Sequence, residues 1–161
     1  MDQPIESYSK LRLTDLKTAL ESNNFDVYLA ENKQAASETV LKDIIPNLNA
    51  RTISWGGSMT FIDTGLYAQL KENPDLEVLD TFDKKITAEE MLERRRQALL
   101  VDLFITGTNA VTETGQLVNL DMIGNRIGAL TFGPKWVIVL VGRNKIAADL
   151  DEAMFRVKNY V

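Results

Sequence analysis

The sequence predicts an α/β protein in which a mostly parallel sheet carries helices on both faces. The main observation is that strand-like and helical apolar periods alternate along the chain, with short polar turns between them. A length of 161 residues suffices to bury a core, and 45% hydrophobic with 25% charged residues is ordinary globular usage. Because no repeat, low-complexity tract or linker interrupts the pattern, we expect one domain over residues 1–161.

The N-terminal part of the chain predicts a helix, a strand and a second helix. Leu13, Leu16 and Leu20 have helical spacing, and the polar residues 22–24 end this first helix. Residues 25–30 (FDVYLA) then predict a strand, because they are rich in aromatic and aliphatic side chains. The second helix is shortened by a proline and has one apolar stripe, formed by Ala36, Val40, Leu41, Ile44, Ile45 and Leu48.

In the middle of the chain, apolar runs of strand length alternate with helical stripes. Asn73-Pro74 stops one helix, and Thr87 with Glu90 three residues later has the spacing of an N-cap and its partner. In order, these patterns predict a strand at 52–55, a helix from 59 to the Asn73-Pro74 stop, a strand at 76–79, a helix through 100 and a strand at 103–105.

The C-terminal part predicts short strands, two helices and one long apolar strand. Residues 109–121 are β-branched and contain glycine, which favours one or two short strands with a turn at Gly115; residues 124–130 favour a short helix. Trp136–Val141 (WVIVLV) is a continuous apolar run, and we predict it to be the clearest buried strand. Asp149 begins a last helix, whose apolar face is Leu150, Ala153, Met154, Val157 and Tyr160.

Composition excludes several kinds of site. The sequence has a net charge of −5 and contains no Cys and no His, so these 161 residues offer no disulfide, thiolate metal site or iron–sulfur cluster. Acid–base chemistry must therefore use Asp, Glu, Lys, Tyr or a bound cofactor, and no cofactor is identified. The acidic balance argues against a nucleic-acid partner. No secretory signal and no apolar run of ~20 residues is present, so we expect a cytoplasmic protein without a membrane partner.

A glycine-containing turn follows the strand at 52–55 and begins a helix. Open α/β sheets bind ligands at such turns, where glycines let the backbone approach an anion. The candidate ligand-binding residues here are Gly56, Gly57, Ser58 and Thr60. The alternative is a tight strand-to-helix turn in which Ser58 is simply the N-cap.

The segment 106–126 is unusually rich in hydrogen-bonding side chains. Loops held by a rigid sheet often carry function. Its candidate ligand-binding residues are Thr106, Gly107, Thr108, Asn109, Asn119, Asn125 and Arg126. The alternative is that the Asn and Thr side chains satisfy local turns while Asp121 and Arg126 form an ordinary ion pair.

Glu113 is the candidate catalytic residue of this segment. It is flanked by small residues beside Gly115, and if buried it can serve as a base or a covalent nucleophile. The alternative is a solvated carboxylate.

Three further features have both a functional and a structural interpretation. Arg95 or Arg96 can recognise a carboxylate or phosphate, although a solvated charged face, with Glu90 paired to Arg94, explains the same residues. Trp136 is better explained by core packing than by ligand stacking. The turn at 142–145 (GRNK) can bind an anion or be a polar turn.

These segments resemble the LUD (lactate-utilisation) domain family. The resemblance is closest over residues 93–146, which include TNAVTETGQLVN, and extends more loosely back through SWGGSMTFIDTGL to the N-terminal helix. It implies a Rossmann-like three-layer fold, within the superfold of ribose-phosphate isomerases, aminosugar-phosphate deaminases, CoA transferases and folate-cyclising enzymes, with a ligand cleft above the strand ends. In this resemblance Gly56, Gly57 and Ser58 match the anion-binding loop, and Glu113 with Gly115 matches the family's E-T-G turn.

For some members the family implies a link to operons that oxidise lactate to pyruvate alongside iron–sulfur subunits. Many relatives continue into a cysteine-containing tail, and this sequence has no Cys, so we do not expect it to bind a cluster directly. We expect binding of a small anionic metabolite in 2-hydroxy-acid metabolism. The alternatives are a non-catalytic subunit or ligand sensor acting through oxidoreductase partners, and a sugar-phosphate isomerase or CoA-transferase-like enzyme. The superfold also makes a homodimer an expectation.

Overall fold

The structure, a computed structural model, describes residues 3–161, which form two compact units. The first unit comprises the described residues up to Glu31 together with Thr108–Leu120 and Gly142–Val161. The second comprises Asn32–Gly107 and Asp121–Val141. The single domain over 1–161 stays a prediction.

The second unit contains a four-stranded, all-parallel sheet, as the sequence predicts for the main sheet. Its strands are β1 (Thr52–Trp55), β2 (Glu77–Val78), β3 (Leu103–Gly107) and β6 (Trp136–Leu140). They lie in the order β2-β1-β3-β6, with Ile53 aligned with Leu103 and Leu103 aligned with Trp136. The strand at 103–105 is longer than predicted and reaches Gly107.

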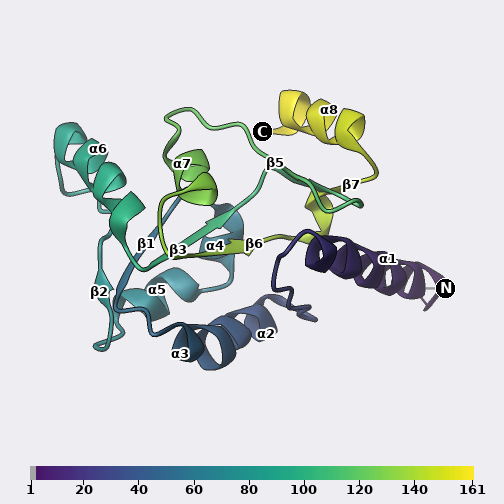
Figure 1. The fold of residues 1–161 in the computed structure, drawn as a ribbon, viewed down its shortest axis with the longest axis horizontal. Helices are drawn as coiled ribbons and strands as arrows, with labels where there is room; N and C mark the ends of the chain where they lie inside the picture. The colour runs from purple at the N-terminus through teal and green to yellow at the C-terminus, as the bar shows by residue number, and fades with distance from the viewer. Residues whose placement is uncertain (1–2) are drawn as a thin grey trace. The chain divides into compact units, whose positions relative to one another are not determined.

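Side chains alternate between the two faces of this sheet, and each face has its own core. Ile53, Leu103 and Ile105 pack on one face with residues of the helices that precede and follow β1. Phe104 packs on the other face with Ala98 and Ala129. Figure 1 shows α2, α3 and α5 on one side of the strands and α7 on the other. The prediction of a Rossmann-like three-layer α/β fold is therefore confirmed.

The helices of the second unit begin where short-range hydrogen bonds satisfy their first N–H groups. The side chains of Ser58 and Thr87 accept from the N–H three residues ahead, as the sequence predicts for Thr87. The helices are α2 (Lys33–Glu38), the π-helical η1 (Thr39–Ile44), α3 (Ile45–Leu48), α4 (Met59–Asp63), α5 (Leu66–Lys71), α6 (Ala88–Gln97), the 3₁₀ turn η2 (Ala98–Leu100) and α7 (Asn125–Thr131).

Two predictions for this unit are wrong. The single helix expected from residue 59 is split into α4 and α5, because Gly65 adopts a left-handed conformation with φ of 76°. Trp136–Val141, predicted to be the clearest buried strand, forms the edge strand β6, whereas β3 is buried along its whole length. Trp136 is 46% exposed rather than core, because an edge strand has a neighbour on one side only.

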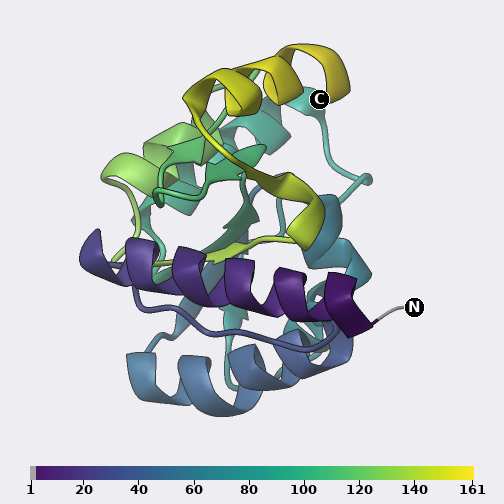
Figure 2. The same ribbon diagram turned by 90° about the vertical axis from the view of Figure 1, so that its right-hand side faces the viewer.

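The first unit is built on a small three-stranded sheet. β4 (Ala110–Thr112) pairs antiparallel with β5 (Leu117–Val118) and parallel with β7 (Ile146–Ala147). The predicted turn at Gly115 is confirmed, with φ of 81°. α8 (Leu150–Tyr160) lies across these strands, as Figure 2 shows, and buries Ala153 against Ala110 and Ala147. The longest helix of the unit is α1 (Gln3–Ser22), and a 3₁₀ turn, η3 (Arg143–Lys145), precedes β7.

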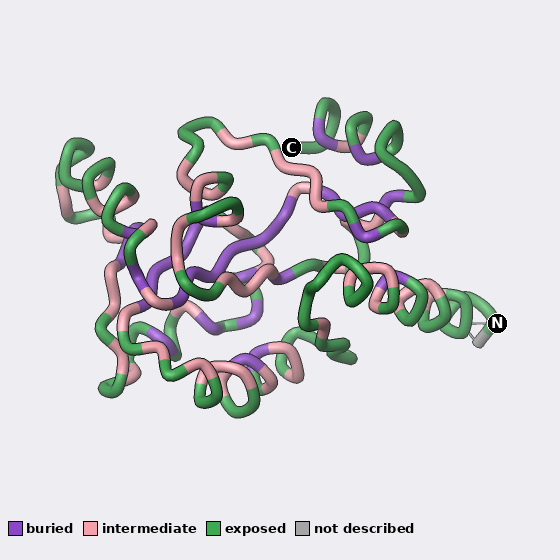
Figure 3. Tube along the Cα trace, viewed as in Figure 1, coloured by how far each residue is buried: buried purple, intermediate pink, exposed green. Residues whose placement is uncertain are grey.

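The strand predicted at 25–30 is also wrong. The segment lies in the first unit and belongs to no strand, and Phe25, Tyr28 and Leu29 are all at least 40% exposed. Figure 3 shows the contrast between this exposed stretch and the buried β3. The composition is that of a strand, but none of the residues described here pairs with it along a ladder, and a strand exists only where it has such a partner.

Candidate functional site

The carboxyl ends of β1 and β3 form the switch point of the parallel sheet. From β1 the chain passes through α4 and α5, which pack on one face, to β2 on one side. From β3 the next strand of this sheet is β6, on the opposite side. Because the chain leaves these two adjacent strands in opposite directions, their carboxyl ends are the position at which open α/β sheets bind ligands.

Two glycines allow the segments at this switch point to pack closely. A Cβ on Gly56 would lie 3.0 Å from the Phe104 ring and 3.0 Å from the Thr106 hydroxyl. A Cβ on Gly107 would lie 2.6 Å from the Ser58 hydroxyl. The glycines at these positions are therefore required by packing, and they hold the turn 56–58 directly against the end of β3.

Gly57 differs from both of these glycines. It is exposed, its φ is not in the left-handed region, and a Cβ placed on it would meet nothing within 4 Å. The Gly56 N–H donates to the Ile105 carbonyl at 3.0 Å, but among the described residues no acceptor is paired with the N–H groups of Gly57 and Ser58. The N–H groups of Gly57 and Ser58 are therefore two backbone donors that lie beside open space at the switch point.

The hydroxyl residues near this turn are used structurally. The Ser58 hydroxyl accepts the Phe61 N–H and caps α4, which is the structural alternative given by the sequence. Thr60 lies half-buried in the first turn of α4. Thr106 is fully buried beneath Gly56, so its hydroxyl faces the packed interior of the sheet rather than the open space at Gly57.

A charged cluster beside the end of β1 is absent from the sequence-based site. Thr81 donates its hydroxyl to the Trp55 carbonyl at 2.6 Å, which ties the segment after β2 to the end of β1. The adjacent Asp80 carboxylate accepts from Lys71 Nζ at 2.8 Å and from the Tyr67 hydroxyl at 3.1 Å. In the sequence, the sign of this cluster is the polar pair Asp80-Thr81 directly after the predicted strand at 76–79. Only the fold brings Tyr67 and Lys71 to Asp80.

The Asp80 carboxyl and the Lys71 amine of this cluster are both held in their ionised forms. Burial raises the pKa of Asp80, but hydrogen bonds from Lys71, the Phe82 N–H and Tyr67 outweigh it, so the pKa lies below its usual value. The hydrogen bonds to Asp80 and Tyr67 raise the pKa of Lys71. The cluster is therefore a permanent ion pair at neutral pH, and this favours a structural role beside the switch point.

The predicted residues of the hairpin in the first unit mostly satisfy local backbone groups. Thr108 is buried and donates to the carbonyls of Ala110 and Val118, at 3.0 and 3.2 Å. The Asn109 side chain accepts the Leu120 N–H at 2.8 Å. The Asn119 side-chain oxygen is buried and has no hydrogen-bond partner among the described residues.

Glu113 forms an ion pair with Arg12 of α1. Its backbone N–H donates to the Ala147 carbonyl at 2.9 Å, and Arg12 Nη2 reaches the Ile146 carbonyl at 3.4 Å. Gly115, two residues after Glu113, lies very close to Ala19: a Cβ on Gly115 would be 3.0 Å from the Ala19 backbone. Within the first unit the E-T-G turn therefore joins α1 to the small sheet.

A double-mutant cycle should detect this joint. We expect Arg12→Ala and Glu113→Gln each to destabilise the first unit by less than about 1 kcal/mol, with a coupling of roughly 0.2–1 kcal/mol, since the pair is partly exposed. The coupling should decrease in 1 M salt. Chemical unfolding of the four proteins measures it, and additive effects of the two changes would contradict a stabilising pair.

Asn125 and Arg126 lie in the second unit, in the first turn of α7. Asp121 accepts the backbone N–H groups of Arg126 and Ile127, at 2.8 and 3.1 Å, and so caps this helix. Burial outweighs the opposing effect of Asp121 and lowers the pKa of Arg126. A half-buried guanidinium that remains cationic is a favourable partner for an anion.

Two of the arginines of α6, Arg94 and Arg96, are paired along the helix. Arg94 bonds to Glu90 at 2.8 Å, which confirms the predicted intrahelical pair, and it also reaches the Asp80 carbonyl at 3.1 Å. Arg96 lies 3.3 Å from Glu93. In the first unit, the turn at 142–145 is a tight one, in which the Lys145 N–H donates to the Gly142 carbonyl.

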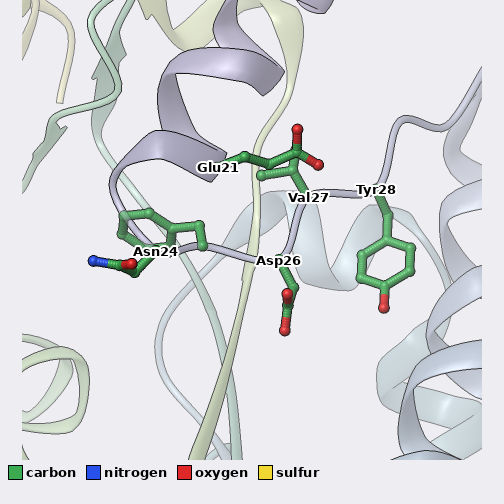
Figure 4. A pocket seen from close by; sticks show the side chains of 6 residues that line it. Glu21, Asn24, Asp26, Val27 and Tyr28 are labelled. Atoms are coloured by element: carbon green, nitrogen blue, oxygen red, sulfur yellow. The ribbon is translucent and has the colours of Figure 1, made fainter.

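The first unit also has an open hollow of about 580 Å³ that sequence analysis missed. It is lined by the end of α1 and the segment after it: Glu21, Asn24, Phe25, Asp26, Val27 and Tyr28. Figure 4 shows that Asp26 and Tyr28 project to one side of this segment and Val27 to the other. Two carboxylates line the hollow, which makes it unfavourable for an anion.

Within residues 3–161, no three side chains among His, Cys, Asp and Glu gather closely enough to hold a metal ion. No helix of the described chain combines the length and the apolar character needed to cross a membrane.

Comparison with known proteins identifies the family. A search of curated proteins and a search of solved structures each find no match. The model of the LUD domain family, however, matches residues 13–161, which is nearly the whole chain. The match includes the turn at Gly56 and Gly57, all strands of both sheets, and the E-T-G turn at Glu113. The chain therefore belongs to the LUD domain family, a family related to lactate utilisation.

Proposed function

We propose that this protein binds a small anionic metabolite at the carboxyl ends of β1 and β3, in the metabolism of 2-hydroxy acids such as lactate. The proposal is carried by two N–H groups, those of Gly57 and Ser58, which have no acceptor within residues 3–161 and lie beside open space at the switch point. Backbone N–H groups that converge beside a glycine bind carboxylates and phosphates. Membership of the LUD family supports the link to 2-hydroxy acids.

The chemistry of the turn limits the ligand class. A carboxylate or a phosphate group supplies the oxygen acceptors that two backbone donors require. The closely packed Gly56 and Gly107 support the site by keeping the turn rigid, so little entropy is lost when a ligand binds. Lactate, pyruvate, sugar phosphates, acyl-CoAs and reduced folates all carry such groups, and they form the test panel.

Thermal unfolding with this panel tests the proposal. A ligand at a hundred times its dissociation constant adds about 2.7 kcal/mol to the free energy of unfolding. For a chain of this size, that corresponds to a rise in Tm of roughly 5–11 °C. We expect one ligand class to raise the Tm of the wild-type protein and to leave the Tm of Gly57→Val unchanged, since the valine side chain would occupy the open space.

The design separates loss of binding from loss of folding. Without ligand, Gly57→Val should unfold within about 1 °C of the wild type, because its Cβ meets no neighbour. Ala68→Val adds a similar volume on an exposed position of α5 and should keep the ligand shift. A ligand shift of equal size in Gly57→Val and in the wild type would refute binding at this turn.

A catalytic role of Glu113 is a separate part of the proposal. Its carboxylate would act as an acid–base or nucleophilic group. The ion pair with Arg12 supports a fixed position but also occupies the carboxylate. In a turnover assay on a substrate of this protein, Glu113→Gln should reduce kcat at least about a hundredfold; wild-type turnover by this variant would remove Glu113 from the mechanism.

A further inference from the structure

The two edges of the four-stranded sheet differ in how well they are protected. β2, at one edge, has two residues, includes the charged Glu77, and follows Pro74 closely. β6, at the other edge, has five residues, all of them apolar, and contains no charge. Natural sheets protect their edges with short strands, charges, prolines or bulges. A proline precedes both edge strands, Pro74 before β2 and Pro134 before β6, and Lys135 directly precedes β6. The two edges therefore differ in length and in charge within the strand, since β6 is longer than β2 and has no charged residue of its own.

The outer edge of β6 presents a regular set of backbone groups. The Trp136 N–H donates to the Asp102 carbonyl, so the backbone groups of Trp136 point toward β3. In a strand, successive residues direct their N–H and C=O groups to opposite sides. Ile138 therefore also bonds toward β3, whereas Val137 and Val139 direct their N–H and C=O groups outward. None of the strands in residues 3–161 pairs with this outer edge.

We propose that β6 pairs antiparallel with β6 of a second copy of this chain, about a two-fold axis at Ile138. In this register Val137 lies opposite Val139 of the second copy, and each exchanges two hydrogen bonds with the other. Antiparallel pairing requires residues with outward backbone groups to face each other, and this register satisfies the requirement at both positions. The two parallel sheets then form one continuous sheet across the dimer.

The side chains of β6 match the same two-fold axis. Ile138 lies opposite Ile138 of the second copy, and Trp136 lies opposite Leu140 of the second copy. Trp136, Ile138 and Leu140 share one face of the strand, and apolar pairs of this kind stabilise antiparallel neighbours. Trp136 is 46% exposed, so pairing would remove a large aromatic surface from water.

Charge does not oppose this pairing. Lys135 is the charged residue next to β6, and the register sets it opposite Val141 of the second copy rather than opposite a lysine. The two copies of Lys135 are then six positions apart along the strands, or roughly 20 Å. This distance exceeds the Debye length at physiological salt, so repulsion between them is screened.

Sedimentation equilibrium of the full chain over a range of concentrations tests the proposal. We expect the wild-type protein to be a reversible dimer. Val139→Pro removes an outward N–H in each copy but no bond to β3, and should weaken dimerisation at least roughly tenfold, as expected for the loss of two hydrogen bonds. Trp136→Lys should weaken it comparably, by placing a charge opposite Leu140.

A matched control variant and a check of folding separate loss of dimerisation from loss of the fold. Phe132→Lys changes a residue that is 95% exposed but lies outside β6, and it should leave the dimer intact. The far-UV circular dichroism of each variant reports whether the fold is retained, and Trp136→Lys decides the question if Val139→Pro does not fold. A monomeric wild-type protein at all concentrations, or a folded Trp136→Lys variant that dimerises as the wild type does, would overturn the proposal.

Discussion

Phe61→Ala should lower the free energy of unfolding of the second unit by about 3–5 kcal/mol, the cost of emptying a large site in a packed core. Phe61 is fully buried in α4, beneath the glycine turn. Its ring centroid lies 5.5 Å from that of Trp55 and 6.3 Å from that of Tyr67. Loss of the ring therefore leaves a cavity among aromatic neighbours that cannot rearrange to fill it.

Tryptophan fluorescence during chemical unfolding measures this effect. Both tryptophans of the sequence, Trp55 and Trp136, belong to the second unit, so the signal reports that unit. Met59→Ala, in the same helix but 72% exposed, should change the stability by no more than about 0.5 kcal/mol. Equal effects of the Phe61 and Met59 changes would contradict the packing described for α4.

Asp102→Ala should cost about 2–4 kcal/mol, because it removes an ionised acceptor from several donors at once. One carboxylate oxygen accepts the N–H groups of Arg51 and Thr52, each at 3.0 Å, and the Thr52 hydroxyl at 3.1 Å. The other accepts Lys135 Nζ at 2.6 Å. Asp102 thus joins the starts of β1, β3 and β6, and its loss leaves the backbone donors at the start of β1 without their acceptor.

The effect should depend on pH in a defined direction. The hydrogen bond from Lys135, followed by those from the backbone of Thr52 and Arg51, lowers the pKa of Asp102. A carboxyl whose pKa is lowered by folding stabilises the protein above its unfolded value, near 3.9, and loses this contribution as the pH falls below that value. The stability difference between the wild type and Asp102→Asn should therefore be full at pH 7 and decrease below about pH 4.

Lys135→Ala serves as the control for this network. The Lys135 side chain is 75% exposed, so its loss should cost less than about 1 kcal/mol. A small effect of Lys135→Ala beside a large effect of Asp102→Ala would assign the stabilisation to the backbone donors. If both changes had the same effect, the ion pair would carry it, and the role assigned to the donors of Arg51 and Thr52 would be wrong.

The helix starts were predictable because their determinants are local. Thr87 and Asp149 accept N–H groups three residues ahead, and Gly115 supplies the positive φ of its turn. Such features depend on residues that are close in sequence, so the local amino-acid sequence is enough to identify them. The strand β1 and the glycine turn after it were found for the same reason.

Several of the tertiary contacts depend on residues that are far apart in sequence. Arg12 and Glu113 are 101 positions apart, and the hydrogen bonds of Asp102 to Arg51 and Thr52 span 51 and 50 positions. A single sequence contains no periodic signal for such pairs. For this reason Glu113 was predictable from the sequence only as a candidate carboxylate, and Asp80 and Asp102 were not predictable from it.

By itself, the sequence determined the α/β class, the parallel main sheet, the helix caps and the turn at Gly56 and Gly57. Only the tertiary structure decided that the apolar run at β6 is an edge strand, that residues 25–30 have no strand partner, and that Gly57 opens to free space while Gly56 is packed. The physical reason is that burial belongs to a position in the fold. A run of apolar residues can form a central strand, an edge strand or an exposed segment. Which of these it forms depends on the neighbours that segments distant in sequence provide.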